Sequence, residues 1–415
     1  MSREKIIRVG LDVPVPTLFD YRIDEANDAD VGCRVRVPFG RGERIGIVLA
    51  ILDRSDVPEH KLKRATVLYR EGPRLGTDDV ELVRFASDYY QYALGAAVMS
   101  TLPARLCRAE TKSRAVESCF AITDAGLSVA TDTLPARAGT QRRLLEVLQS
   151  KRTLDRKAAL ALSRNAIGML RLFVANGWVE ERAGAEATPT GSSAPAAAPQ
   201  LTPHQQAAVQ AIRAALGSFS AFLLLGVTGS GKTEVYLRAI ESTLAAGRQA
   251  LLLVPEIALT PQLCETIAGR FGGNALVVLH SALNETERLR HWTAAQSGSA
   301  RVVVGTRLAV FVPMPELGLI VVDEEHDASF KQSEGLCYSA RDLAVVRARQ
   351  RNVPIVLGSA TPALESYYNA QRERYRLLPL PERINARPPR VHVVDTRGAR
   401  IDEGLAPPLI AALQG

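Results

Sequence analysis

Apolar residues follow two different patterns along the chain, and each pattern predicts its own kind of strand. Over residues 33–37 a cysteine and two valines alternate with arginines, so a strand here would have one apolar and one cationic face. After a break that contains proline and glycine, the apolar pattern resumes over residues 44–51, which predicts a β-hairpin within residues 31–51. Residues 221–225 and 319–322 are instead continuously apolar, as is typical of buried strands in a parallel sheet. The pattern therefore predicts a small β domain and a separate α/β domain.

Helical periodicity dominates residues 141–181, where two helices precede a strand that starts at residues 177–179. The apolar faces of the helices comprise Leu144, Leu145, Leu148, Ile167, Leu170 and Val174. Basic residues lie among them: Arg142, Arg143, Lys151, Arg152, Arg156, Lys157, Arg164 and Arg171. This combination favours a winged-helix unit whose basic side chains either contact phosphates or form a solvated face. Residues 183–200 are rich in Ala, Pro, Ser, Thr and Gly and predict a flexible linker.

A glycine-rich loop joins the strand predicted at residues 221–225 to a helix. It comprises Gly226, Val227, Thr228, Gly229, Ser230, Gly231, Lys232 and Thr233. In this order the backbone N–H groups can point at phosphate oxygens, and the helix N-terminus adds a partial positive charge. Lys232 can reach the β- and γ-phosphates, and Thr233 can ligate Mg²⁺. The loop therefore predicts a site for a nucleoside triphosphate and Mg²⁺, with an ordinary glycine-rich turn as the alternative.

Acidic residues follow the second continuously apolar strand. Asp323 and Glu324 stand at its C-terminal edge, and His326 follows two residues later. Asp323 can hold Mg²⁺ through water, and Glu324 can polarise an attacking water molecule. Acidic residues are also common in loops, but the phosphate loop upstream favours the catalytic interpretation.

The Asp-Glu-x-His spacing resembles the motor box of superfamily 2 helicases, and further segments resemble motifs of that superfamily in the same order. Gln205 stands where these helicases place a glutamine that recognises adenine, which implies ATP as the nucleotide. Residues 253–262, with Thr306 and Arg307 further on, resemble the motifs that contact a DNA strand. A further segment resembles the helicase motif that couples hydrolysis to movement, and it comprises Ser359, Ala360 and Thr361. A tight loop is the alternative interpretation of this segment.

The N-terminal segment resembles the 3′-end-binding domain of the primosomal protein N′ (PriA) family, the bacterial replication restart helicases. Residues 14–21, 32–40 and 44–48 carry the resemblance. In that family a pocket binds the terminal nucleotide of a nascent leading strand, and the resemblance implies that it is lined by Phe19, Asp20, Gly40 and Lys63. An aromatic ring can stack on the last base, and an aspartate can accept a hydrogen bond from a 3′-hydroxyl. Without the resemblance, Phe19 would be interpreted as a core residue and Asp20 as a turn former.

The resemblance covers essentially the whole chain. Residues 327–342 match the aromatic-rich loop of the family, in which Phe330, Tyr338 and Arg341 would sense DNA beside the ATP site. The family continues into a second motor lobe with an arginine finger, a cysteine-rich zinc module and a further DNA-binding domain, none of which is found before residue 415. We therefore expect the 415-residue chain to bind forks and ATP without unwinding DNA. Zinc is expected for the family, but its cysteine cluster is absent here.

Composition adds weaker signals. The formal net charge of +7 agrees with a nucleic-acid partner but is weak support by itself. None of the five cysteines forms a C-x-x-C pair, so neither a zinc site nor a disulfide framework is indicated. No apolar run approaches the length of a membrane span, and no signal peptide is visible at the N-terminus. These features predict a cytoplasmic protein that does not contact a membrane.

Together these observations predict an α/β protein in which a RecA-like phosphate-loop lobe follows a small β-barrel and a winged helix. The expected segments are a β-barrel at 1–103, a winged helix at 104–182, a linker at 183–200, a RecA-like lobe at 201–395 and a connection at 396–415. The resemblance implies an ATP-dependent 3′→5′ DNA helicase that recognises abandoned or stalled replication forks and starts primosome assembly, so that the replicative helicase is reloaded. Implied partners are forked and single-stranded DNA, other primosome proteins and single-stranded DNA-binding protein. The alternatives are a nucleotide-independent fork-binding protein and a different phosphate-loop ATPase, such as a transporter or kinase.

Overall fold

The computed structural model describes residues 4–108, 118–129, 139–163, 165–183, 199–384, 392–397, 401 and 404–414. The chain divides into two compact units: one contains residues 1–198, 261–277 and 282–300, and the other contains residues 199–260, 278–281 and 301–415. Most of the predicted linker at 183–200, part of the connection at 396–415, and Arg164 lie outside the described residues. Within the described part of the chain, no helix is long and apolar enough to cross a membrane.

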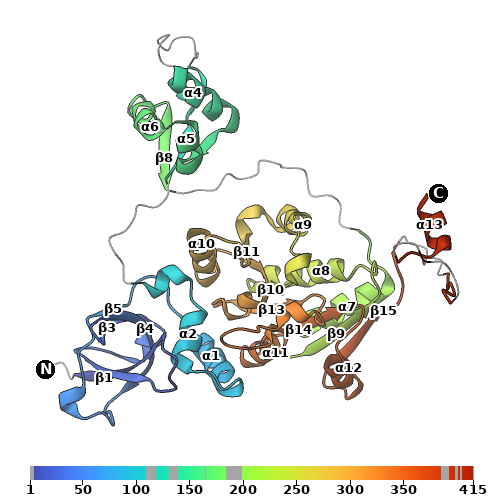
Figure 1. Ribbon diagram of the computed structural model, residues 1–415, viewed down its shortest axis with the longest axis horizontal. Helices are drawn as coiled ribbons and strands as arrows, with labels where there is room; N and C mark the ends of the chain where they lie inside the picture. The colour runs from blue at the N-terminus through green and yellow to red at the C-terminus, as the bar shows by residue number, and fades with distance from the viewer. Residues whose placement is uncertain are drawn as a thin grey trace. The chain divides into compact units, whose positions relative to one another are not determined.

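The first sheet is antiparallel and has the strand order β2-β1-β4-β3-β5 (Figure 1). Its strands are β1 (Lys5–Leu11), β2 (Phe19–Ile23), β3 (Arg34–Phe39), β4 (Gly42–Leu52) and β5 (Val67–Tyr69). The β3–β4 pairing confirms the predicted hairpin, with Arg34 opposite Ile47. Residue Arg22 of β2 exchanges backbone hydrogen bonds with Lys63 and Ala65 just before β5, so the two outer strands of the sheet are linked. Helices α1 (Thr77–Tyr89) and α2 (Leu94–Ser100) follow the sheet in the chain.

The prediction of a cationic face over residues 33–37 is wrong in part. Val35 and Val37 are fully buried, as the alternation predicts, but Arg34 is also buried and only 4% exposed. Its guanidinium carbon lies 5.0 Å from the centre of the Tyr69 ring, because β5 places Tyr69 opposite Arg34. Arg36 lies 3.5 Å from the Glu43 carboxylate. Neighbouring strands therefore engage arginines that the pattern alone assigns to an open face.

The acid stability of this first sheet should depend on Asp30, a buried carboxylate in the turn before β3. Burial opposes its ionisation, but hydrogen bonds from Arg70 and from the Asn27 N–H outweigh this, so the pKa of Asp30 lies below its usual value. A depressed pKa stabilises the fold above the unfolded-state value of about 4, and this stabilisation is lost as pH falls through the folded-state pKa.

We therefore expect the melting temperature of the chain to fall between about pH 5 and pH 3 and to fall less steeply in Asp30→Asn. Thermal melts followed by circular dichroism across this range test the prediction. Parallel curves for the two proteins would assign the acid sensitivity to other carboxylates.

The second sheet is small, with the antiparallel order β7-β6-β8. It contains β6 (Ser118–Ile122), β7 (Thr153–Asp155) and β8 (Val179–Ala183), and it is accompanied by α3 (Asp124–Leu127), α4 (Gly139–Lys151), α5 (Arg156–Leu162) and α6 (Ala166–Ala175). Leu144, Leu145, Leu148 and Leu170 are fully buried in one cluster with Phe173, which confirms the predicted apolar faces. Helices α4, α5 and α6 with a short sheet agree with a winged helix, and that assignment stays a prediction.

The third sheet has the strand order β11-β12-β10-β13-β14-β9-β15 (Figure 1). Its strands are β9 (Ala221–Gly226), β10 (Gln249–Leu253), β11 (Leu276–Leu279), β12 (Val302–Gly305), β13 (Leu317–Val322), β14 (Ile355–Ser359) and β15 (Arg376–Leu380). The pairings of β10 with β12 and β13, of β13 with β14, and of β9 with β14 and β15 are parallel. This confirms the parallel sheet predicted from the continuous apolar runs, and β13 is buried along its whole length.

One helix precedes this sheet in the chain, and others lie between its successive strands. They are α7 (Pro203–Ala214), α8 (Lys232–Ala245), α9 (Pro261–Phe271), α10 (Glu285–Gln296), α11 (Ala340–Gln350) and α12 (Leu364–Gln371), and α13 (Pro407–Gln414) stands at the end of the described chain. Helix α8 packs on β10 and β13, and α11 packs on β13 and β14. Because β9, β13 and β14 are neighbouring parallel strands, the segments that follow each of them meet at one edge of the sheet.

Candidate functional site

The phosphate loop lies between β9 and α8, as the sequence predicts. Gly229 and Gly231 have φ angles of +81° and +78°, which glycine adopts without the strain that a side chain would cause. The Gly231 carbonyl accepts hydrogen bonds from the N–H groups of Glu234 and Val235, so α8 begins directly behind the loop. Gln205 of α7 donates from Nε2 to the carbonyl of Ser230 at 3.0 Å and thereby braces the loop from behind.

Lys232 folds back toward the start of its own loop. Its ammonium donates to the Gly226 carbonyl at 3.1 Å and lies 3.5 Å from Oε1 of Glu324. The lysine is only 8% exposed, and Glu324 occupies the left-handed region with φ +45°, which is unusual for a residue with a side chain. The loop lysine and the acidic box are therefore in direct contact across the edge of the sheet.

Asp323 ends strand β13 and is held through one carboxylate oxygen. Its Oδ1 accepts hydrogen bonds from the Tyr236 hydroxyl at 2.9 Å and from the Glu324 N–H at 3.0 Å. Burial raises the pKa of Asp323, and the Tyr236 hydrogen bond partly offsets that rise. A nearby cation would favour its ionised form.

His326 connects the acidic box to the predicted coupling motif. Its Nδ1 lies 2.8 Å from the Ser359 hydroxyl and 3.7 Å from Glu324 Oε2, and its Nε2 lies 3.4 Å from the Thr361 hydroxyl. Ala360 stands between these two hydroxyl residues in the turn after β14. The imidazole therefore contacts both the acidic box and this turn.

The loop and the acidic edge fit a Mg²⁺-bound nucleotide. The hydroxyl of Ser230 is buried and has no hydrogen-bond partner among the described residues, so it is available to a phosphate oxygen. Thr228, Gly229 and Thr233 are exposed at the loop surface. Asp323 and Thr233 supply oxygen atoms, which are the ligands that Mg²⁺ prefers. Among the described residues, no group of three or more His, Cys, Asp or Glu side chains forms a metal site independent of a nucleotide.

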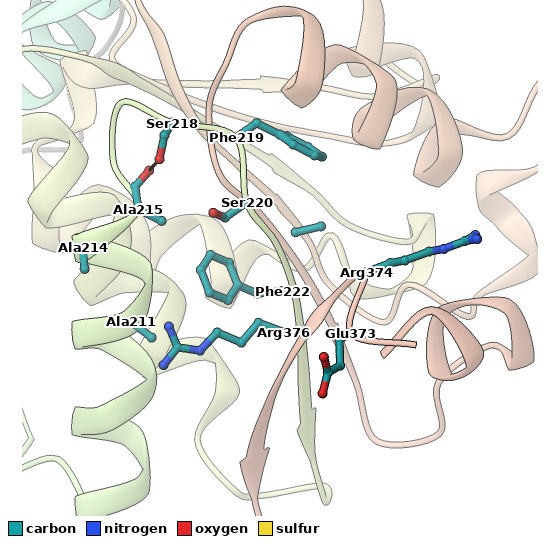
Figure 2. A pocket seen from close by; sticks show the side chains of 11 residues that line it. Ala211, Ala214, Ala215, Ser218, Phe219, Ser220, Phe222, Glu373, Arg374 and Arg376 are labelled. Atoms are coloured by element: carbon teal, nitrogen blue, oxygen red, sulfur yellow. Dashed lines mark hydrogen bonds between the residues drawn. The ribbon is translucent and has the colours of Figure 1, made fainter. Parts of the chain in front are cut away.

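A hollow of about 430 Å³ opens at the opposite end of β9 (Figure 2). It is lined by Ala221 and Phe222 at the start of that strand, by the last part of α7, and by Glu373, Arg374 and Arg376. In parallel α/β sheets, ligands bind at the carboxyl ends of the strands. The hollow is therefore not the nucleotide site.

Glu325, the third residue of the acidic box, is fully buried and holds three partners. Its Oε1 accepts from the Ala363 N–H at 2.8 Å, while Oε2 accepts from the Ser366 hydroxyl at 2.8 Å and lies 3.3 Å from the Arg341 guanidinium. Ala363 and Ser366 belong to the first turn of α12. Glu325 thus joins the acidic box, the predicted aromatic-rich loop and the helix after the coupling motif.

The aromatic rings of that loop point inward. Phe330 and Tyr338 are 3% and 2% exposed, and the Tyr338 ring packs edge-on against Phe311 with centroids 5.0 Å apart. Arg307 donates to the Ser329 carbonyl at 3.3 Å, and Thr306 is buried at the start of the same 3₁₀ turn. DNA contact by these residues stays a prediction, and base stacking on either ring requires the loop to rearrange.

In the first sheet, Asp20 is paired rather than open. Its carboxylate accepts hydrogen bonds from Arg8 Nε and Nη2 at 2.8 and 2.9 Å and from the Ser55 hydroxyl at 2.5 Å. The Asp20 side chain is 3% exposed.

The aromatic part of the predicted pocket lies on neighbouring segments of the same sheet. Phe19 packs edge-on against Phe39 with ring centroids 5.1 Å apart, and Gly40 follows Phe39 in an open turn with φ +61°. Lys63 is exposed, and its carbonyl accepts a hydrogen bond from the Arg22 N–H.

Comparison with known proteins assigns the chain to a family. The family model described as the 3′DNA-binding domain of PriA matches residues 8–103, and that of the DEAD/DEAH box helicases matches residues 202–370. The replication restart protein PriA of Haemophilus influenzae is 37% identical over 420 residues, which cover 99% of this chain and 56% of that protein. The chain belongs to the PriA family. Within the family, the PriA of Bacillus subtilis is 49% identical over 200 residues, 48% of this chain and 25% of that protein.

The solved structure of RecG bound to a three-way DNA junction is 26% identical and covers 46% of this chain and 25% of that one, with a TM-score of 0.36. The chain spans about half the length of the PriA relative that it matches from end to end.

The structure brings together most residues that the sequence predicts for the nucleotide site. The loop, the acidic box and the coupling motif meet at one edge of the sheet, where Lys232 contacts Glu324 and His326 contacts Ser359. Sequence reasoning missed four partners of the predicted residues: Arg8, Ser55, Tyr236 and Glu325. Of these four residues, only Glu325 could have been found from the sequence, because it lies between Glu324 and His326 in the acidic box.

Proposed function

We propose that this chain binds ATP with Mg²⁺ and forked DNA, as part of an ATP-dependent 3′→5′ helicase that restarts replication at abandoned or stalled forks. The observation that carries the proposal is the contact between the phosphate loop on β9 and the acidic box on β13. The 3.5 Å approach of Lys232 to Glu324 joins a phosphate-binding cation to a carboxylate that can activate water. Membership of the PriA family supports the remainder of the proposal.

Each residue of the site has a defined task in this proposal. When ATP binds, the Lys232 ammonium would leave Glu324 and the Gly226 carbonyl and contact phosphate oxygens instead. Glu324 would then be able to orient water. Asp323 and Thr233 would hold Mg²⁺, which would offset the negative charge of the phosphates. Family resemblance assigns adenine recognition to Gln205, although its amide here is engaged by the Ser230 carbonyl and the Thr202 N–H. His326 connects the site to Ser359.

ATP hydrolysis by the 415-residue chain, measured with and without forked DNA, tests the proposed function. Stimulation by DNA supports a motor. DNA binding without any nucleotide binding would favour the nucleotide-independent fork-binding alternative. Other primosome proteins and single-stranded DNA-binding protein are proposed partners, and the cytoplasm is the proposed compartment.

For the first sheet we propose a pocket for the 3′ end of a DNA strand at Phe19, Asp20, Gly40 and Lys63. The chain should bind a fork whose leading strand ends in a 3′-hydroxyl more tightly than the same fork with a 3′-phosphate. The phosphate removes a hydrogen-bond donor and brings negative charge toward Asp20. Two unit charges about 4 Å apart in water repel by about 1 kcal/mol, so we expect roughly fivefold discrimination, limited by the charge of Arg8.

Fluorescence anisotropy with the two forks measures this ratio. Asp20→Asn should bring it close to one. Asp53→Asn is a matched control, because Asp53 pairs with Lys5 on the exposed surface of the same sheet, and it should keep the wild-type ratio. Equal affinity of the wild-type chain for both forks would contradict the pocket.

A further inference from the structure

Tyr236 lies four residues after the loop lysine on α8 and is therefore on the same side of the helix. Its ring is 2% exposed, and its hydroxyl donates to Oδ1 of Asp323 at 2.9 Å. A carboxylate oxygen only accepts, so the tyrosine hydroxyl is the donor in this pair. The two residues stand 87 positions apart in the sequence, and no motif in the sequence pairs them.

Strand β14 closes the other side of the hydroxyl. A Cβ atom placed on Gly358 would lie 1.6 Å from the Tyr236 oxygen, so only glycine fits beside it. Gly358 immediately precedes Ser359, and its carbonyl accepts a hydrogen bond from the Glu325 N–H at 3.0 Å. The Tyr236 hydroxyl is therefore enclosed by the phosphate-loop helix, the acidic box and the strand of the coupling motif.

Both hydrogen bonds that Asp323 accepts fall on one oxygen. Tyr236 and the Glu324 N–H occupy Oδ1, while Oδ2 accepts no hydrogen bond from the described residues. A carboxylate fixed in this way has one oxygen committed to the protein and the other available to a cation or its water.

We propose that Tyr236 is a positioning residue that orients Asp323 toward Mg²⁺ and holds that orientation against the phosphate-loop helix and the coupling strand. The proposal rests on the proposed Mg²⁺–nucleotide site. Partners that orient a metal ligand typically change metal affinity by about 10- to 100-fold when they are removed. A merely structural hydroxyl would change stability without a selective effect on Mg²⁺.

The test uses Tyr236→Phe, which removes the hydroxyl and keeps the ring. Thr243→Val is the matched control. Thr243 is buried on the same helix, and its hydroxyl donates to the Ala239 carbonyl at 2.9 Å, within α8. The readout is the affinity of the 415-residue chain for a fluorescent N-methylanthraniloyl-ATP, first in EDTA and then across a Mg²⁺ titration.

We expect Tyr236→Phe to bind the nucleotide in EDTA within about twofold of wild type and to need about tenfold more Mg²⁺ for half-saturation. Thr243→Val should match wild type in both measurements. In an Asp323→Asn background, Tyr236→Phe should cause no further change in the Mg²⁺ requirement, because the two residues act as one unit.

A Mg²⁺ titration of Tyr236→Phe that coincides with wild type would overturn the proposal. So would an equal loss of affinity with and without Mg²⁺, or a further loss in the Asp323→Asn background. A wild-type chain that binds no nucleotide would overturn the proposed function and the role of Tyr236 together. The outcomes above overturn only the role of Tyr236, so the two failures can be distinguished.

Discussion

Replacement of Lys232 by alanine should weaken the binding of Mg²⁺–ATP by about 10- to 100-fold while the fold remains intact. Hydrogen bonds to charged groups contribute about 1.5–3 kcal/mol, and every 1.4 kcal/mol is a factor of ten in affinity. The fold should tolerate the change because Lys232 is a nearly buried cation, and its desolvation opposes folding. Of its two partners, Glu324 has a side chain that is 35% exposed, so water can replace the ammonium there.

Titration of a fluorescent ATP analogue into the purified chain measures the loss, and circular dichroism checks the fold. Lys61→Ala is the control, because Lys61 lies in an exposed 3₁₀ turn of the first sheet. Unchanged affinity in Lys232→Ala would contradict the assignment of the phosphate loop. A parallel loss of secondary structure would contradict the expectation that the residue serves binding alone.

The elements that sequence could predict are those whose cause is local. The period of apolar residues predicts the β3–β4 hairpin and the buried strand β13, and the spacing of glycines predicts the loop before α8. The acidic box could be predicted because it comes directly after a continuously apolar strand. For each of these features, a few consecutive residues carry the whole signal.

The features that sequence could not predict depend on residues far apart in the chain. Arg8 neutralises Asp20 across a strand pair, and Tyr236 reaches Asp323 across the sheet. The inward direction of Phe330 and Tyr338 depends on how their loop folds over η7 (Arg307–Phe311), which contains Phe311. An aromatic residue in a loop looks the same in sequence whether its ring is buried or exposed.

The second large effect is expected from the replacement of Glu325, and it is a loss of stability. Glu325→Ala should destabilise the unit that contains the parallel sheet by about 3 kcal/mol, because two donors that Glu325 now satisfies would be left without a partner, at about 1–3 kcal/mol each. Arg341 would keep Asp342 as its only ion-pair partner among the described residues, and the Ala363 N–H and the Ser366 hydroxyl would lose their acceptor. A loss of this size lowers the melting temperature of a unit of 150–250 residues by roughly 6–12 °C.

Asp342→Asn is the matched control for Glu325→Ala, because both carboxylates pair with the same arginine. Asp342 lies 2.8 Å from Arg341 but is 54% exposed, whereas the Glu325 side chain is fully buried at 3.3 Å. Exposed pairs contribute about 0–1 kcal/mol, so the control should melt within about 4 °C of wild type. Differential scanning calorimetry of the two variants measures the contrast. Equal melting temperatures would mean that water already reaches Glu325, and that the acidic box and α12 are not joined through a buried charge.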